Sequence, residues 1–265
     1  MKVDVKRNPT SIEDGSAVRN ESRSRSSSTN RVSAAREREL WKRVLDLGCL
    51  FLALPFLVPV MVVIALWIKL ASRGPVFFHQ ERIGFRGRPF RLYKFRSMEV
   101  SVDPWVHQRY MGHLMQSDVP MKKMDATGEH PLIPWGWVLR ASGLDELPQV
   151  FNVLRGEMSL IGPRPCTLFE YEHYLPWHKR RCDTLPGLTG LWQVSGKNKT
   201  TFKQMMDLDI YYTERKSLWL DLRILGKTIW VPISQIQDAH AGRAQRKVGA
   251  GEIRYGRLPK PNPEL

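Results

Sequence analysis

The stretch "LGCLFLALPFLVPVMVVIALWI", residues 47–68, contains no charged side chain, and it has the length of a membrane span. It is too long, and lies too far from the N-terminus, for an ordinary cleaved signal peptide. A buried core helix is the alternative, but a fully apolar helix of this length is rare in a soluble domain of this size. The stretch therefore predicts a helix embedded in a membrane.

Basic residues lie on both sides of this stretch: Arg36, Arg38, Lys42 and Arg43 precede it, and Lys69, Arg73, Arg82, Arg86 and Arg88 follow it. The positive-inside rule draws both flanks towards the cytoplasm, which a straight span cannot satisfy. Pro55 and Pro59 lie within the stretch, and each removes a helix hydrogen bond, so we expect a sharp bend. A re-entrant helix, which breaks and returns to the same face, satisfies both observations. An ordinary span that tolerates its prolines stays open.

The composition outside this stretch sets the expected boundaries. Residues 1–35 include "RNESRSRSSSTNR" and few apolar side chains, which predicts a disordered basic tail. The Gly, Arg and Pro content from residue 239 onward predicts a flexible C-terminal tail over residues 239–265. Between the tails we expect a membrane helix over residues 36–72 and one globular domain over residues 73–238.

The formal net charge of +15 indicates a polyanionic partner: nucleic acid, an anionic lipid surface or a phosphorylated substrate. Charge alone does not choose among them. The three cysteines, Cys49, Cys166 and Cys182, are too few for a disulfide framework and lack the CxxC spacing of a zinc site. We expect reduced, packing thiols in a cytosolic setting.

The predicted fold class is α+β. Residues 74–98, "GPVFFHQERIGFRGRPFRLYKFRSM", alternate in two short runs around residues 84–87, which is typical of a β-hairpin. Helices are expected at residues 149–154, 167–181, 201–215 and 218–236, with a short strand at residues 159–161. The last helix has an apolar side, which suits core packing, the simpler interpretation, or a membrane interface. We thus expect a re-entrant helix followed by a small, mostly helical domain with a short hairpin and interfacial helices.

Two neighbouring acids, Asp145 and Glu146, lie in "SGLDELPQVFNVLRGEMSLIGPRP", residues 142–165. Ser142-x-x-Asp145 has the form of a capping box, which would make the pair structural. A helix starting there would carry Pro148 in its second turn, whereas a start near Leu147 places the proline in the first turn, which it prefers. The acids would then lie at a helix N-terminus, which attracts anions. Adjacent carboxylates could divide the work of attack or metal binding and proton transfer.

Basic side chains near turns or element ends could clamp a diphosphate: Lys94, Arg96, Arg140, Arg164 and Lys197. Any one of them taken alone is more typical of a solvated surface charge. They form a site only if the fold brings them together.

At these residues the chain resembles the bacterial sugar transferases, the monotopic polyprenyl-phosphate phosphoglycosyl transferases, over roughly residues 41–236. Several motifs carry the resemblance in the same order along the chain. They are "KRVLD", "GPVFFHQERIG", "YKFRSM", "LDELPQVFNVLRGEMSLIGPRP", "PGLTGLWQVSGKN", "LDIYY" and "SLWLDLRIL".

The resemblance implies a helix broken at Pro59 and an Asp145–Glu146 dyad. In such enzymes the aspartate attacks the sugar-bearing phosphorus of a nucleotide diphosphate sugar, nucleoside monophosphate leaves, and polyprenyl phosphate takes the phosphosugar. It also implies Mg²⁺ against Asp145, and the five basic residues named above as phosphate and nucleotide contacts. The implied location is the cytoplasmic face of a bacterial inner membrane, with membrane lipid as a partner, no nucleic acid, and a homodimer left open.

Four positions depart from the family's pattern. Val58 stands where a serine is common before the proline, Gly143 replaces a common serine, Lys197 replaces arginine, and Leu185 occupies a position that is often basic. A lysine offers a point charge where arginine offers a bidentate fork. Nucleotide or sugar choice could change, but the dyad is intact.

Two other classes of function stay open at this stage. The charge and the Arg/Ser-rich tail would suit a membrane-tethered nucleic-acid-binding protein, although no helix-turn-helix, zinc or RNA-binding motif supports it. A catalytically silent scaffold of polysaccharide assembly is the other, and the intact dyad argues against it. The sequence leaves the sugar, the nucleotide and the polymer undetermined.

Overall fold

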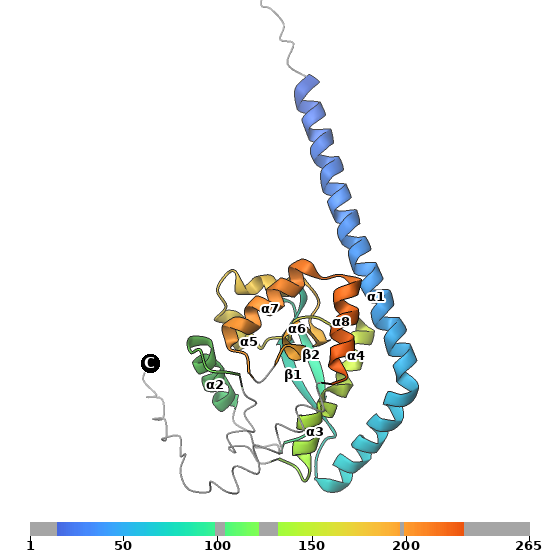
Figure 1. The fold of residues 1–265 in the computed structure, drawn as a ribbon, viewed down its shortest axis with the longest axis vertical. Coiled ribbons are helices and arrows are strands. Elements are labelled where there is room, and N and C mark those ends of the chain that lie inside the picture. The colour runs from blue at the N-terminus through green and yellow to red at the C-terminus, as the bar shows by residue number, and fades with distance from the viewer. Residues whose placement is uncertain (1–14, 99–103, 122–131, 197–198, 231–265) are drawn as a thin grey trace, which may run out of the picture. The chain divides into compact units, whose positions relative to one another are not determined.

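A computed structural model describes residues 15–98, 104–121, 132–196 and 199–230 of the chain, and its elements are labelled in Figure 1. The helices and 3₁₀ turns are α1 (Gly15–Ala71), η1 (Phe85–Gly87), α2 (Pro104–Gln116), α3 (Gly136–Ser142), η3 (Leu144–Gln149), α4 (Val150–Arg155), α5 (Leu168–Glu172), η4 (His178–Asp183), α6 (Leu191–Val194), α7 (Phe202–Arg215) and α8 (Leu218–Thr228). The strands are β1 (Phe77–Ile83), β2 (Pro89–Phe95), β3 (Ser159–Ile161) and β4 (Gly187–Thr189). The predicted α+β class is confirmed.

The chain divides into two compact units, Met1–Leu45 and Asp46–Leu265. Helix α1 begins at Gly15, inside the segment that the composition predicts to be disordered. The Ala, Arg and Glu residues just before the membrane stretch favour helix, and propagating an existing helix costs far less than nucleating one. The C-terminal tail predicted from residue 239 lies outside the described residues.

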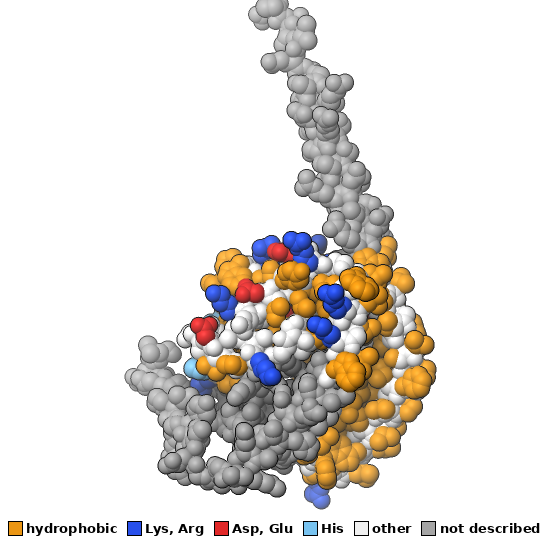
Figure 2. All heavy atoms as spheres, viewed as in Figure 1, with side chains coloured by type: hydrophobic (Ala, Val, Ile, Leu, Met, Phe, Trp, Pro, Cys, Tyr) orange, Lys and Arg blue, Asp and Glu red, His pale blue; other side chains and the backbone are white. Residues whose placement is uncertain are grey.

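Part of α1, Leu40–Ala71, is long and apolar enough to cross a membrane, and only 17% of its most apolar window is buried. A core helix would be mostly buried, so this exposure disfavours the core alternative. Figure 2 shows hydrophobic side chains covering the side formed by this helix. From residue 46 onward the exposed large side chains are Phe51, Leu52, Phe56, Val58, Val60, Val62, Val63, Leu66 and Leu70. The helix is a candidate membrane anchor.

Helix α1 passes through Pro55 and Pro59 without ending. Figure 1 shows that this part of the helix curves instead of breaking. A proline clashes with the carbonyl four residues back, and bending the helix away from that contact relieves the clash. Helix α1 therefore bends without ending, and the return to one membrane face stays a prediction.

Strands β1 and β2 form the predicted hairpin, pairing antiparallel from Phe77 opposite Phe95 to Ile83 opposite Pro89. Arg86 and Gly87 in the turn both have positive φ, and glycine takes this conformation without strain. Lys94 pairs with Phe78, and residues opposite each other share a face of the hairpin. Arg82 lies four residues after Phe78 on β1, so it is on the same face as Lys94. Lys94 on this face contacts Glu146, and Arg82 on the same face contacts the Pro165 carbonyl.

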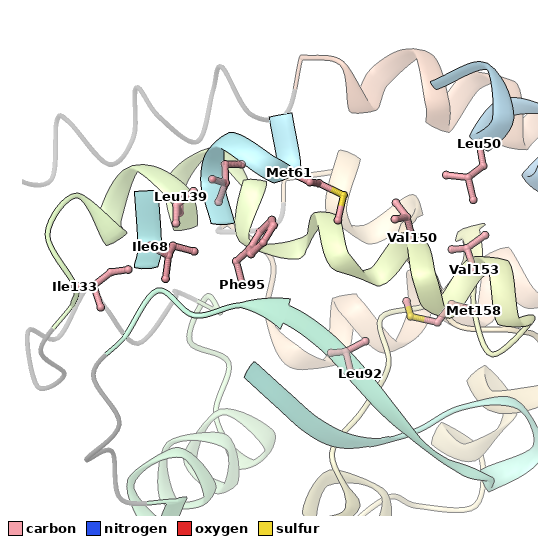
Figure 3. Packing of buried hydrophobic residues seen from close by; sticks show 11 residues of the cluster. Leu50, Met61, Ile68, Leu92, Phe95, Ile133, Leu139, Val150, Val153 and Met158 are labelled. Carbon is pink, nitrogen blue, oxygen red and sulfur yellow. The ribbon is translucent and has the colours of Figure 1, made fainter. Parts of the chain in front are cut away.

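The main core joins the membrane helix to the hairpin, as Figure 3 shows. Leu50, Met61 and Ile68 of α1 pack with Leu92 and Phe95 of β2 in one buried cluster. The same cluster takes in side chains on both sides of the acid pair: Ile133 and Leu139 before it, and Val150, Val153 and Met158 after it. Because these side chains are buried in one cluster with those of α1, the segments that flank the acid pair pack against the apolar helix.

A second, parallel pair of strands, β3 and β4, holds the "GPRP" segment. The strand at 159–161 is confirmed, whereas β4 is not predicted by the sequence pattern. A Cβ on Gly187 would lie 2.0 Å from the Gly162 nitrogen, so these backbones approach as only glycines allow. The Gly187 N–H donates to the Pro163 carbonyl at 2.8 Å, and the "PGLTG" motif therefore shapes this loop.

The predicted helices are recovered with two changes. Helices α4 and α7 lie at the predicted places. The single helix expected over residues 167–181 is α5 followed by η4, because Pro176 cannot continue a helix and the residue before it avoids helical angles. Helix α8 ends at Thr228, and residues from 231 onward lie outside the described part of the chain.

Candidate active site

The acid pair lies in the first turn of η3, which leads directly into α4. Gly143, before this turn, adopts φ 76°, so the chain reverses between α3 and η3 at a residue suited to a left-handed conformation. Asp145 is buried, with 6% of its surface exposed, whereas Glu146 is half-buried. The two neighbouring carboxylates therefore occupy different environments, as a division of labour requires.

The capping-box alternative for Ser142 and Asp145 is wrong. The Ser142 hydroxyl donates back to the Val138 carbonyl at 2.7 Å, and η3 has no side-chain cap. A serine bonded to the carbonyl four residues back satisfies itself within the preceding helix. Asp145 is thus not used to cap a helix through Ser142.

Lys94 of β2 is brought to the acid pair. Its Nζ lies 3.0 Å from Oε1 of Glu146. The hairpin is fixed beside the dyad by Asn152, whose side chain accepts from the Tyr93 N–H at 3.2 Å and donates to the Arg91 carbonyl at 2.7 Å. The predicted cation Lys94 therefore lies beside the acid pair.

Arg96, another of the predicted cations, lies at the end of α1. Its guanidinium donates to the carbonyls of Arg73 at 2.8 Å and Ser72 at 3.1 Å. These carbonyls follow the last turn of α1, where carbonyls lack helical partners and a cation is stabilising. Arg96 is buried and secures the end of the membrane helix. Sequence spacing could not separate it from Lys94, two residues away.

The remaining predicted cations are distributed around the acid pair and the "GPRP" segment. Arg140, in the last turn of α3, lies just before the pair, with Nη1 3.2 Å from the Met98 sulfur. Arg164 donates from Nη1 to Oε1 of Glu170 at 3.0 Å. Lys197 lies outside the described residues.

Residues 162–165, here called the GPRP loop, are surrounded by buried charges. The Arg82 Nη1 donates to the Pro165 carbonyl at 3.3 Å, and the Arg181 Nη2 donates to the Arg164 carbonyl at 2.8 Å. Arg181 is also ion-paired with Asp209, and both side chains are 1% exposed. Burial alone would lower the pKa of Arg181, but Tyr174 and Asp209 raise it above its usual value.

One electrostatic environment connects this loop with the acid pair. Burial, followed by the neighbouring Arg164 cation, lowers the pKa of Arg82 to about 10, while Glu170 and Glu146 oppose this shift. Burial would raise the pKa of Glu170, yet Arg164 and Arg82 outweigh it and lower the pKa to about 2. Glu146 therefore pairs with Lys94 and also has a minor influence on the pKa of Arg82.

Sequence reasoning missed Glu170, Arg181 and Asp209. One signal was present: Thr167-x-x-Glu170 is a capping box, and the structure has both of its hydrogen bonds. The burial of Arg181 and Asp209 carries no local signature, because only the folded chain brings η4 and α7 together.

The donor set suits a magnesium ion shared with a substrate. Mg²⁺ is commonly held by one or two carboxylates plus substrate phosphate oxygens. Asp145 and Glu146 supply two such groups, while no cluster of three or more His, Cys, Asp or Glu side chains occurs within the described ranges. A dedicated all-protein metal cage is thus not present in that part of the chain.

These features define a domain with a candidate membrane anchor, an acid pair whose aspartate is buried, and a cationic loop. A family profile described as bacterial sugar transferase matches residues 37–235, and the chain belongs to this family.

Three relatives illustrate the likeness. The chain is 42% identical over 159 residues to a galactosyl transferase, CpsE, of Streptococcus agalactiae, covering 60% of this chain and 34% of the relative. It is 35% identical to an uncharacterised sugar transferase, EpsL, of Bacillus subtilis, covering 80% of this chain and 98% of the relative. It is 37% identical to a UDP-glucose:undecaprenyl-phosphate glucose-1-phosphate transferase of Caulobacter vibrioides, covering 72% of this chain and 69% of the relative. The chain thus spans a third of the first relative's length and nearly all of the second's.

Proposed function

We propose that this chain transfers a sugar-1-phosphate from a UDP-sugar to undecaprenyl phosphate and releases UMP, the initiating step of exopolysaccharide, capsule, O-antigen or glycoconjugate assembly. The observation that carries the proposal is the buried Asp145 beside Glu146, with Lys94 3.0 Å from Glu146, in a chain of this family. The names of the relatives support the substrate classes.

In the proposed reaction, a carboxylate oxygen of Asp145 attacks the phosphorus that bears the sugar. A P–O bond forms to Asp145, and the bond to the nucleoside monophosphate breaks with its electron pair leaving on that phosphate. A phosphate oxygen of the lipid then attacks the same phosphorus and displaces the Asp145 carboxylate. Two in-line displacements leave Asp145 as it began.

The surrounding charges have distinct proposed roles. Lys94 and Arg164 neutralise diphosphate oxygens, since phosphoryl transfer depends on positioning and charge stabilisation. Glu146 fixes Lys94 and is available to bind a cation or to move a proton. Magnesium, which Asp145 and Glu146 would hold with substrate oxygens, supplies charge neutralisation at the phosphates when bound.

The proposed location is the cytoplasmic face of the inner membrane, where a soluble nucleotide sugar and a lipid phosphate at headgroup level can both reach the dyad. The basic residues on both flanks of the apolar stretch support a re-entrant α1. Single cysteines at Arg38 and Arg73 should both react with a thiol reagent from the cytoplasmic side. Labelling from opposite sides would replace the re-entrant helix with a simple span.

The test of function uses the full chain in detergent or nanodiscs with undecaprenyl phosphate, Mg²⁺ and a panel of UDP-sugars. UMP release and the mass of the lipid product are measured. We expect one or a few sugars to give a lipid-linked diphosphate sugar, and Asp145→Asn to abolish it. Asp183→Asn, which removes an exposed acid, is the matched control and should retain turnover. Wild-type protein that yields no UMP with any sugar would contradict the proposal.

A further inference from the structure

Glu170 is a fully buried carboxylate, with 0% of its surface exposed, at the third position of α5. Its Oε2 accepts from the Thr167 N–H at 2.6 Å and lies 3.7 Å from Nη1 of Arg82. Its Oε1 accepts from Nη1 of Arg164 at 3.0 Å. One buried acid therefore joins two cations and a helix N-terminus, and its position is determined from three directions.

The backbone of the GPRP loop is held by two arginines. Arg82 binds the Pro165 carbonyl, and Arg181 binds the Arg164 carbonyl. Arg181 is itself fixed by Asp209 and by the Tyr174 hydroxyl at 2.7 Å. The Arg181 contact to the main chain at Arg164 therefore does not depend on Glu170, whereas Arg82 is itself paired with Glu170.

The three arginines differ in exposure. The side chain of Arg181 is 1% exposed and that of Arg82 is 7% exposed, whereas 23% of the Arg164 side chain remains exposed. Arg164 carries a planar fork of five N–H donors, and it donates to Glu170 through Nη1. Of this trio, Arg164 has the most exposed side chain.

We propose that Glu170 is a positioning residue, which orients the guanidinium of Arg164 for a phosphate of the nucleotide sugar; this inference rests on the function proposed above. Glu170 does not touch the substrate. It anchors one edge of the Arg164 fork, so that the rest of the fork meets the phosphate in a single orientation. A pre-oriented fork loses less side-chain entropy on binding than a mobile one, and the gain appears in nucleotide affinity.

The test compares Glu170→Gln with Glu172→Gln, which removes an exposed acid from the same helix. We expect Glu170→Gln to raise the KM for the UDP-sugar roughly tenfold, with the KM for undecaprenyl phosphate unchanged. The dissociation constant of UDP, measured by calorimetry without turnover, should rise by a similar factor. Glu172→Gln should change neither value. The double variant Arg164→Lys with Glu170→Gln should have the same KM for the UDP-sugar as Arg164→Lys alone, because both substitutions act through one contact.

Folding is followed through thermal unfolding and through the buried thiols of Cys166 and Cys182, which should stay unreactive in a native variant. If Glu170→Gln does not fold, Glu170→Asp carries the same prediction, because it keeps the charge and withdraws it by one methylene. Loss of cooperative unfolding in both variants would overturn the inference and assign Glu170 a structural role.

The outcomes separate this inference from the proposed function. Turnover by the wild-type chain with equal UDP-sugar KM in Glu170→Gln overturns the inference alone. If Glu170→Gln binds UDP more weakly than the wild-type chain does, the positioning role is supported. If the wild-type chain also makes no lipid product, the proposed transferase activity is contradicted.

Discussion

Nζ of Lys94 lies 3.0 Å from Oε1 of Glu146, which joins strand β2 to the turn that carries the acid pair. Both side chains are partly exposed, 22% for Lys94 and 30% for Glu146. An ion pair in this setting contributes little to stability. We therefore expect this ion pair to matter for catalysis, by holding the Lys94 charge in place beside the acid pair.

We expect Lys94→Met to lower kcat/KM roughly tenfold to a hundredfold, while the free energy of unfolding changes by less than about 1 kcal/mol. The substitution removes the Lys94 charge, which we propose neutralises substrate phosphate. It removes only a partly exposed ion pair, so stability changes little. Steady-state kinetics and denaturant unfolding measure the two effects. Lys203→Met, on the exposed side of α7, should leave both unchanged. A large stability loss with intact kcat/KM would refute this assignment.

Asp46 links the membrane helix to the strand before the GPRP loop. Its Oδ1 accepts from the Ser159 hydroxyl at 3.0 Å and from the Leu160 N–H at 3.1 Å, and the side chain is 1% exposed. We expect Asp46→Ala to destabilise the protein by about 2–4 kcal/mol, since buried donors lose a charged acceptor. Ser159→Ala should cost less. Unfolding midpoints that are equal to wild type for Asp46→Ala would disprove the link.

The close approach of β3 and β4 predicts that Gly187→Ala does not fold. The added Cβ would lie 2.0 Å from the Gly162 nitrogen, and backbone atoms on both strands would have to move. Gly226→Ala in α8 is the control, because nothing lies within 4 Å of its Cβ and alanine favours helix. Circular dichroism and yield of folded protein test both variants. A folded, active Gly187→Ala chain would show that the two strands can separate.

Glu170 predicts a defined loss of stability in acid. Folding lowers its pKa from 4.5 to about 2, so its contribution is fully present above pH 4.5 and is lost as the pH falls towards 2. The shift corresponds to about 3 kcal/mol. The difference in unfolding midpoint between wild type and Glu170→Gln should therefore shrink between pH 5 and pH 3. A difference that stays constant over this range would mean that Glu170 is not held as a carboxylate.

Much of the fold could be predicted from patterns that are local in sequence. The apolar stretch predicts the anchor, the alternation around residues 84–87 predicts the hairpin, and Thr201 begins α7 with a capping box. The strand β4 could not be predicted, because it forms by pairing with β3, which lies in a separate part of the sequence.

The candidate site divides in the same way. The structure places Lys94 beside Glu146 of the acid pair, whereas Arg96 secures the end of α1. A cation at an element end is suited both to a phosphate and to helix carbonyls, and only the fold decides between them. Asp209 and Arg181 were invisible because charged residues are mostly exposed, and nothing local marks the rare buried pair.

The central claim is that Asp145 carries the phosphosugar, and peptide mass spectrometry tests it most directly. The full chain is incubated with its UDP-sugar and Mg²⁺ without lipid acceptor, then digested. We predict one added sugar phosphate on the peptide that contains Asp145, one UMP released per adduct, and loss of the adduct when undecaprenyl phosphate is added. An adduct on another residue, or an equal adduct in Asp145→Asn, would contradict the account.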